Sequence, residues 1–314
     1  MHFIVTGGCG YIGSHLVKRL YEEGHRVTVI DNFSNNLSLK RAEIVCNWAQ
    51  IYNIDLTNEV MVSQLANVIG FSYNMVDGIF HLASMCSIPD SFLYPDWYLF
   101  NNIWGTVILC KYFKCPILFS SSCSVYGNMN DEKLVKEGLT EKSPLNPTNS
   151  YAESKASAEN IILNHQKSII LRYFNPIGCE IKELKDDSKD RVSEALRKGK
   201  ITIFGDNYDT SDGTPVRDYI HISDLLDVHI LAFGRLLMEP SKIQKIYNIG
   251  VGNGVSVGDL CTFYKKYVNE NLKIEYGEKR NGDVDKIWAN SDLFKKDFGW
   301  EPKFNIIDMV KSIS

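Results

Sequence analysis

The chain of 314 residues is long enough for one large α/β domain or two smaller domains. Its net charge of −4 and pI near 6.0 provide no broad basic field, so nucleic acid is not expected as a partner. No apolar run approaches the roughly 18 residues that a membrane helix needs. An apolar strand pattern begins at Phe3 and leaves no room for a signal peptide, so we expect a cytoplasmic protein with no membrane partner.

Five short apolar runs predict buried strands in chain order. They are followed, in several cases, by amphipathic stretches in which apolar residues recur at helical spacing. One such stretch, 12–25, has Gly24 near its end, where a helix stop is typical. Strands that alternate with helices predict an α/β fold with a Rossmann-like, doubly wound parallel sheet. The predicted strands are 2–6, 26–31, 78–83, 116–121 and 168–174.

The character of the chain changes after Asn175. Segment 180–200 is highly charged and is expected to be partly helical, and Gly- and Asp-rich turns follow at 205–213. We therefore predict two domains, a sheet domain at 1–175 and a smaller C-terminal substrate-binding lobe at 176–314. The part near 216–250 is expected to rejoin the first domain.

The cysteines and histidines give no sign of a metal site. The eight cysteines are scattered without a CxxC pair, which is typical of reduced thiols in a cytosolic protein. The seven histidines include no HxH or HxxxH pair. No metal is therefore expected.

A glycine-rich loop follows the first predicted strand and opens the first predicted helix. Gly8, Gly10 and Gly13 fit G-x-G-x-x-G, and Gly7, Gly10 and Gly13 fit G-x-x-G-x-x-G. Missing side chains let a pyrophosphate approach the backbone N–H groups at the start of a helix. The alternative is a turn that needs glycine for packing alone.

Asp31 ends the second predicted strand, about twenty residues beyond the glycine loop. A carboxylate there can bind both hydroxyls of a ribose, and it repels a 2′-phosphate. No arginine stands beside it, since Asn32, Phe33, Ser34 and Asn35 follow. The pattern predicts NAD as the cofactor in preference to NADP.

A serine, a tyrosine and a lysine follow in the order typical of one enzyme superfamily. Ser120–Ser124 end a predicted strand, and Tyr151 and Lys155 lie four residues apart in the next predicted helix. This order resembles the active site of the short-chain dehydrogenases/reductases. A lysine ammonium and the positive nicotinamide would both favour the phenolate of Tyr151, which needs a pKa well below about 10 to take a proton. The alternatives are an aromatic on a helix face and a polar strand end.

The chain also resembles the UDP-glucose 4-epimerases, a group of the extended NAD-dependent epimerase/dehydratase family, over nearly its whole length. The run 204–221, FGDNYDTSDGTPVRDYIH, is the most specific match. The other matching stretches are 6–15, 30–36, 119–127, 146–155, 171–178 and 282–300.

The resemblance implies a set of site residues. The catalytic residues would be Ser122, Tyr151 and Lys155. The NAD-binding residues would be Gly7, Gly10, Tyr11, Ile12, Gly13, Asp31, Asn32, Ser34, Asn35, Asp55, Leu56, Leu82, Ala83, Asn101, Tyr151, Lys155 and Tyr173. The UDP-sugar would contact Ser122, Tyr151, Asn175, Arg217, Arg280, Asp283 and Ile287. A homodimer is also implied.

The implied activity is the NAD-dependent 4-epimerisation of a UDP-hexose, UDP-glucose and UDP-galactose, through a transient 4-keto sugar. Isoleucine at 287, where relatives often carry a large aromatic residue, implies that the N-acetylhexosamine pair is accepted as well; alternatively Ile287 packs in the core. Two departures from the family pattern stand out: Cys86 replaces a usual lysine, and the stretch between Gly178 and Gly205 is short.

Other reactions of the same fold are the alternatives. A dehydratase needs an Asp-Glu pair where this chain has Cys123 and Ser124, and a non-catalytic NAD sensor would be expected to lack Tyr151 or Lys155. Another NDP-sugar epimerase or a reductase stays open.

Overall fold

The computed structural model describes residues 1–72, 76–129, 131–165, 167–188, 192–239 and 242–313. The chain folds into two compact units, and each is described by itself. The first unit comprises Met1–Ser121, Asn149–Leu171 and His229–Ile246, and the second comprises Ser122–Thr148, Arg172–Val228 and Tyr247–Ser314. The domain limits predicted from the sequence stay a prediction.

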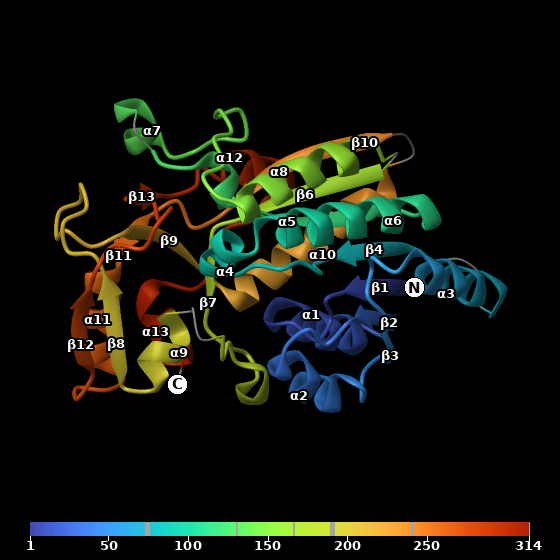
Figure 1. The fold of residues 1–314 in the computed structure, drawn as a ribbon, viewed down its shortest axis with the longest axis horizontal. Helices are drawn as coiled ribbons and strands as arrows, with labels where there is room; N and C mark the ends of the chain where they lie inside the picture. Colours follow the sequence, from blue (N-terminus) through green and yellow to red (C-terminus); the bar gives the residue numbers. More distant parts are fainter. Residues whose placement is uncertain (73–75, 130, 166, 189–191, 240–241, 314) are drawn as a thin grey trace. The chain divides into compact units, whose positions relative to one another are not determined.

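A seven-stranded parallel sheet is the frame of the first unit, as expected (Figure 1). The strand order is β10-β6-β5-β4-β1-β2-β3, so the chain starts in the middle of the sheet and winds outward in both directions. The last residues of β5, β6 and β10 are counted with the second unit. The strands are β1 (His2–Thr6), β2 (Arg26–Asp31), β3 (Gln50–Asn53), β4 (Gly78–His81), β5 (Ile117–Ser122), β6 (Lys167–Tyr173) and β10 (Ile243–Ile249).

The five predicted strands all exist, and two strands at the sheet edges were not predicted. β3 has the sequence QIYN with its first and last residues exposed, and β10 mixes polar and apolar residues. Neither strand is buried on both faces, so neither forms a continuous apolar run.

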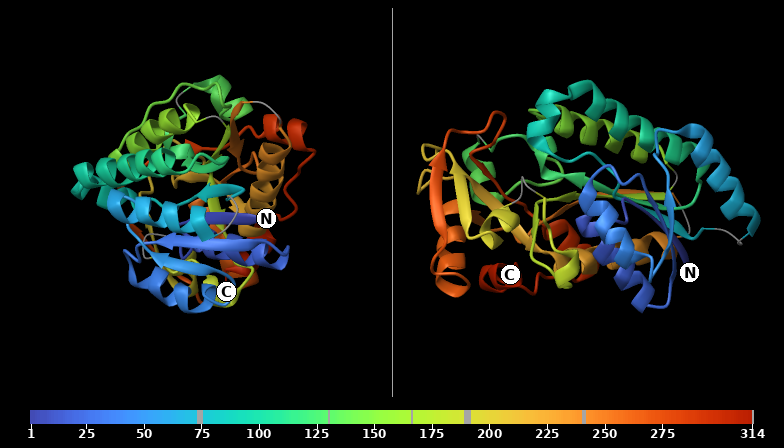
Figure 2. Two further views of the ribbon diagram at one scale, coloured as in Figure 1. Left: turned by 90° about the vertical axis from the view of Figure 1, so that its right-hand side faces the viewer. Right: turned by 60° about the horizontal axis from the view of Figure 1, so that its bottom comes forward.

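Helices cover both faces of this sheet (Figures 1 and 2). Ile4 of β1 joins the core cluster that includes apolar residues of α3, α6 and α8. Its neighbour Phe3 points to the opposite face, where its ring meets Phe233 of α10 at 5.0 Å. The helices are α1 (Tyr11–Glu22), α2 (Asn36–Val45), α3 (Glu59–Ser72), α4 (Ile88–Leu93), α5 (Pro95–Leu99), the π-helical η1 (Phe100–Trp104), α6 (Gly105–Tyr112), α8 (Ser150–Leu163) and α10 (Ile222–Met238), whose last part from His229 belongs to this unit.

Strand β9 organises the second unit. It pairs in parallel with β7 and β13 and antiparallel with β11, and a separate parallel pair is formed by β8 and β12 (Figure 1). The strands are β7 (Asn175–Ile177), β8 (Lys200–Phe204), β9 (Val216–His221), β11 (Gly254–Ser256), β12 (Lys273–Gly277) and β13 (Lys286–Ile287). The helices are η2 (Cys123–Tyr126), α7 (Glu132–Glu137), η3 (Lys182–Leu184), α9 (Val192–Arg197), α11 (Val257–Tyr267), α12 (Asp292–Phe298) and α13 (Ile306–Ser312).

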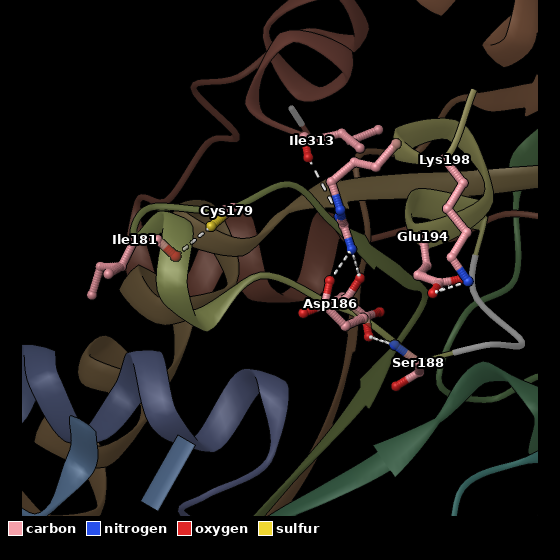
Figure 3. Close-up of polar contacts among 9 residues, drawn as sticks. Cys179, Ile181, Asp186, Ser188, Glu194, Lys198 and Ile313 are labelled. Carbon is pink, nitrogen blue, oxygen red and sulfur yellow. Dashed lines mark hydrogen bonds and ion pairs between the residues drawn. The ribbon is translucent and has the colours of Figure 1, made fainter. Parts of the chain in front are cut away.

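The charged segment 180–200 contains the helical turn η3 and the short helix α9, and residues 189–191 lie outside the described residues. Figure 3 shows polar contacts of this segment, with Asp186 and Ile313 among the labelled residues. Arg197, the last residue of α9, contacts both of them. Its guanidinium donates to the backbone oxygen of Ile313 at 3.3 Å and to that of Asp186, and it forms an ion pair with Asp187 at 2.6 Å. Arg197, whose side chain is mostly buried, therefore ties segment 180–200 to the residue that follows α13.

Candidate active site

The glycine loop between β1 and α1 is packed too closely to accept side chains. Gly7 has a φ of +68°, and a Cβ atom there would lie 2.7 Å from the backbone nitrogen of Ala83. A Cβ atom on Gly13 would lie 2.2 Å from the carbonyl oxygen of Gly7. Backbone bonds from Gly7 N to Ile30 O (2.8 Å) and from Gly10 N to Gly7 O (3.0 Å) hold the turn. This is a backbone cradle of the kind that accepts a pyrophosphate.

Asp31 lies at the end of β2 and beside this loop. Its carboxylate accepts hydrogen bonds from the backbone N–H groups of Cys9 and Phe33, both at 3.0 Å. Burial raises the pKa of Asp31, and these two bonds oppose that effect. The carboxylate is therefore held against the glycine loop, where the sequence predicts the ribose contact.

The next predicted contacts, Asn32 and Asp55, are brought together. The Asn32 amide donates to Asp55 at 3.0 Å, and Thr57 donates to the same carboxylate through its backbone (2.8 Å) and its hydroxyl (2.6 Å). Burial opposes ionisation of Asp55, but the bonds from Thr57 and Asn32 outweigh it, so its pKa lies below the ordinary value. Asp55 is therefore a carboxylate held in place at neutral pH.

The other predicted cofactor residues of the first unit occupy loop ends and helix starts. Asn35 caps α2, because its side-chain oxygen accepts from Leu37 N and Ser38 N. Tyr11 and Ile12 begin α1, Leu56 is buried against Gly105, and Asn101 lies in η1. Backbone nitrogens place the remaining three: Leu82 N donates to Thr6 O, Ala83 N to the Thr6 hydroxyl, and Ser34 N to the Asn32 side chain.

Tyr151 and Lys155 stand one turn apart on α8. Asn149 caps this helix through a 2.9 Å bond to Ala152 N. The Lys155 ammonium lies 6.0 Å from the centre of the Tyr151 ring and donates to the backbone oxygen of Ser120 at 2.7 Å. The lysine is only 3% exposed, so it is held in one place beneath the tyrosine.

Burial lowers the pKa of Lys155 to about 8, although the nearby Cys86 and Glu159 oppose the shift. Burial and the Lys155 charge together lower the pKa of His81 to about 3, so this imidazole is neutral. His81 is bonded to the hydroxyls of Thr6 (2.7 Å) and Thr106 (3.0 Å). His81 therefore adds no second positive charge beside Lys155.

Asn102, which was not among the residues predicted from the sequence, fixes the loop after β4. Its side chain accepts from Met85 N at 2.8 Å, donates to Met85 O at 3.1 Å and donates to the Ser154 hydroxyl at 2.8 Å. It therefore ties the loop that carries Cys86 to the helix that carries Lys155. The only sequence signal is a polar pair, Asn101 and Asn102, in an apolar stretch.

The predicted catalytic serine belongs to the second unit. Ser122 ends β5 and caps η2, because its hydroxyl oxygen accepts from Ser124 N (3.2 Å) and from the Ser124 hydroxyl (2.7 Å). Tyr126, at the end of η2, bonds Asn248 and Arg172, both at 2.7 Å. This buried network holds the turn that carries Ser122.

Three predicted substrate residues form one charged group in the second unit. Arg217 on β9 forms an ion pair with Asp283. Asp283 N donates to Arg280 O at 3.3 Å, and the Arg280 guanidinium lies 3.9 Å from the centre of the Phe204 ring. One guanidinium group in an ion pair on β9 and a second one over an aromatic ring suit a nucleoside diphosphate, since guanidinium forks match phosphate oxygens.

The remaining predicted residues of the second unit also lie along its strands. Asn175 begins β7 opposite Tyr219, and its side-chain oxygen is buried and has no hydrogen-bond partner among the described residues. Ile287 is 2% exposed and pairs with Arg217 in the β13–β9 register, so the two side chains share a face. Tyr173, the last residue of β6, is buried.

A cavity of about 380 Å³ in the second unit includes Lys286 and Trp288 in its lining and none of the predicted substrate residues. Lys286 and Trp288 are the sequence neighbours of Ile287, so their side chains point to the opposite face of the strand from the Ile287 side chain. Within the described residues, no three His, Cys, Asp or Glu side chains gather as metal ligands, and no helix is long and apolar enough to cross a membrane.

The doubly wound sheet, the glycine cradle and the acid at the end of β2 define a dinucleotide-binding protein. The model of the NAD dependent epimerase/dehydratase family matches residues 3–250. The chain belongs to this family.

Individual relatives are similar to this chain over nearly its whole length. The chain is 33% identical to UDP-glucose 4-epimerase 3 of Oryza sativa subsp. japonica, over 98% of this chain and 87% of the relative. It is also 33% identical to the UDP-glucose 4-epimerase of Caenorhabditis elegans, over 100% and 96%. The crystal structure of UDP-glucose 4-epimerase from Bifidobacterium longum in complex with NAD+ and UDP is similar with a TM-score of 0.86 and 28% identity, covering 100% of this chain and 97% of that one.

Proposed function

We propose that this protein catalyses the NAD-dependent 4-epimerisation of a UDP-hexose and interconverts UDP-glucose and UDP-galactose. The observation that carries the proposal is the buried Lys155 ammonium beneath Tyr151 on α8. The same pairing serves several reactions, so the full-length similarity to UDP-glucose 4-epimerases selects among them.

The residues of the first unit fit NAD. The glycine loop would receive the pyrophosphate, and Asp31 would bind the adenine ribose. When bound there, NAD would supply the acceptor for a hydride from C4 of the sugar and the donor for its return. Because both transfers belong to one turnover, no net redox change occurs.

Tyr151 would take the proton from the O4 hydroxyl. It would give the proton back after the 4-keto sugar has rotated and presents its other face to the cofactor. The Lys155 charge stabilises the phenolate, since an opposite charge nearby favours the ionised form. Ser122 would bond the sugar oxygen, and Arg217, Arg280 and Asp283 would hold the nucleoside diphosphate.

Elimination of water is the main competing reaction on this fold. It needs an acid where this chain has Cys123 and Ser124. Burial raises the pKa of Cys123 to about 12, so its thiol does not supply that acid. Another NDP-sugar epimerase or a reductase stays the alternative.

A homodimer is proposed from an exposed apolar stripe on the first unit. Leu93, Trp97, Phe100 and Trp104 follow one another at spacings of four, three and four residues, and their exposed fractions are 69%, 57%, 47% and 41%. Such a stripe on a helical segment is suited to a self-complementary contact between two copies. A cytoplasmic location is also proposed, because the eight cysteines include no CxxC pair and their scatter is typical of reduced thiols in a cytosolic protein.

The decisive experiment mixes purified protein with UDP-galactose and NAD and follows UDP-glucose by NMR. Interconversion without net formation of NADH is the expected result. Formation of a stable 4-keto product would instead support a dehydratase or oxidase, and absence of any conversion would refute the proposal.

A further inference from the structure

Tyr208 is a buried tyrosine for which neither the sequence motifs nor the proposed mechanism has a role. It lies in the loop between β8 and β9, and its side chain is 5% exposed. Its hydroxyl is buried and has no hydrogen-bond partner among the residues that the structure describes. Buried polar groups are nearly always bonded, so such a hydroxyl needs an explanation.

The ring of Tyr208 is held firmly although its hydroxyl bonds none of the described residues. Gly205 has a φ of +94°, and a Cβ atom there would lie 2.4 Å from Cε2 of the ring. The Lys279 ammonium lies 4.1 Å from the ring centre. Tyr208 N donates to Gly213 O at 3.0 Å. A small rearrangement of the ring to find another partner is therefore hindered on several sides.

The surroundings of the hydroxyl are those of the predicted nucleotide site. Burial, together with the charges of Asp283 and Asp285, raises the pKa of Tyr208 to about 12, although Arg217 and Arg280 oppose the shift. These groups include the three charged residues already assigned to the substrate. At neutral pH the hydroxyl is protonated and is a hydrogen-bond donor among them.

Another buried group without a partner has different surroundings. The ring nitrogen of Trp300 lacks a described partner, but its ring packs edge-on against Phe294 at 5.6 Å in an aromatic cluster. Tyr208 is set apart because the charges of two arginines and two aspartates act on its hydroxyl and because the Lys279 ammonium lies over its ring.

We propose that Tyr208 is a further substrate-binding residue, whose hydroxyl donates a hydrogen bond to the pyrophosphate held by Arg217 and Arg280. The inference rests on the proposed function, because it requires a nucleoside diphosphate at this place. The hydroxyl contributes to binding and not to proton transfer, so its loss raises KM for the UDP-sugar and leaves kcat nearly unchanged.

The test is the binding of UDP alone, measured by calorimetry, to the wild-type protein and to Tyr208→Phe. One hydrogen bond to a charged oxygen corresponds to a rise in Kd of roughly 10- to 100-fold. Tyr276→Phe on β12, where the side chain is 60% exposed, is the matched control and should bind UDP like the wild type.

A second measurement separates binding from a structural role. Because the hydroxyl has no described protein partner, Tyr208→Phe should leave Tm without UDP unchanged or raise it, while the increase in Tm on adding UDP becomes smaller. Equal UDP affinity in wild type and Tyr208→Phe would overturn the inference and leave the proposed function intact. A clear fall of Tm without UDP would assign Tyr208 a structural role and overturn it as well. Failure of the wild type to bind UDP would overturn both.

Discussion

The Lys155 ammonium lies 6.0 Å from the centre of the Tyr151 ring and is anchored by a 2.7 Å hydrogen bond to the backbone oxygen of Ser120. The anchor comes from β5 and the lysine from α8, so the position of the charge depends on the packing of helix on sheet. A cation fixed in this way favours the phenolate of Tyr151. Because the ammonium is already in position, the lysine does not have to move when the phenolate forms.

Replacing Tyr151 with phenylalanine should lower kcat for UDP-galactose by about 10²- to 10⁴-fold, the usual contribution of a positioned acid–base group. Lys155→Met should cause a loss of similar order, because the phenolate loses its stabilising charge. Circular dichroism should show that both variants fold. Tyr21→Phe, at an exposed tyrosine of α1, is the control. If Tyr151→Phe kept nearly full activity, Tyr151 would be excluded as the catalytic base.

The stability of the protein should depend on pH through Lys155. Its pKa is lowered from 10.5 to about 8, so between these values the unfolded chain keeps a proton that the folded protein has lost. The free energy of unfolding therefore rises with pH in this window, and the cost of the buried charge is fully present below about pH 8. At about 1.4 kcal/mol per pKa unit, the free energy of unfolding rises by about 3 kcal/mol across this pH window.

Urea unfolding near pH 8 and near pH 10 tests this dependence. The gain in stability with pH should be smaller in Lys155→Met than in the wild type, whereas Lys265→Met, at an exposed lysine of α11, should behave like the wild type. Identical pH dependence in wild type and Lys155→Met would show that the lysine titrates normally.

Trp97→Glu should convert the proposed homodimer into a monomer, because it places a charge in the middle of the exposed apolar stripe. Size-exclusion chromatography with light scattering measures the mass directly. Tyr276→Glu is the matched control, since that aromatic side chain is equally exposed (60% against 57%) and lies in the other unit. A wild-type protein that runs as a monomer would refute the dimer itself.

The residue at 287 should govern whether an acetamido group is accepted at C2 of the sugar. Ile287 shares a face with Arg217, which is a predicted substrate contact. A larger side chain at position 287 therefore narrows the space beside Arg217. Ile287→Tyr should lower kcat/KM for UDP-N-acetylglucosamine far more than for UDP-glucose. Ile287→Val should leave the ratio nearly unchanged. Equal losses for both substrates would mean general damage, in keeping with the 2% exposure of this side chain.

Features that depend on neighbouring residues could be predicted from the amino-acid sequence. The strands at 2–6 and 26–31 were predicted to the residue, since each is a buried apolar run between polar turns. The glycine loop and the i, i+4 relation of Tyr151 to Lys155 are likewise local, and both follow from spacing alone.

Contacts between residues far apart in the sequence became known from the packed structure. Asn102 reaches Ser154, 52 positions away, and the Tyr126 hydroxyl reaches Asn248, 122 positions away, and no local pattern marks either pair. That the Tyr208 hydroxyl is buried and finds no partner in the described part of the chain likewise follows only from the packed structure. Burial and long-range hydrogen bonding depend on how the elements pack, and residue spacing along the chain carries no information about that packing.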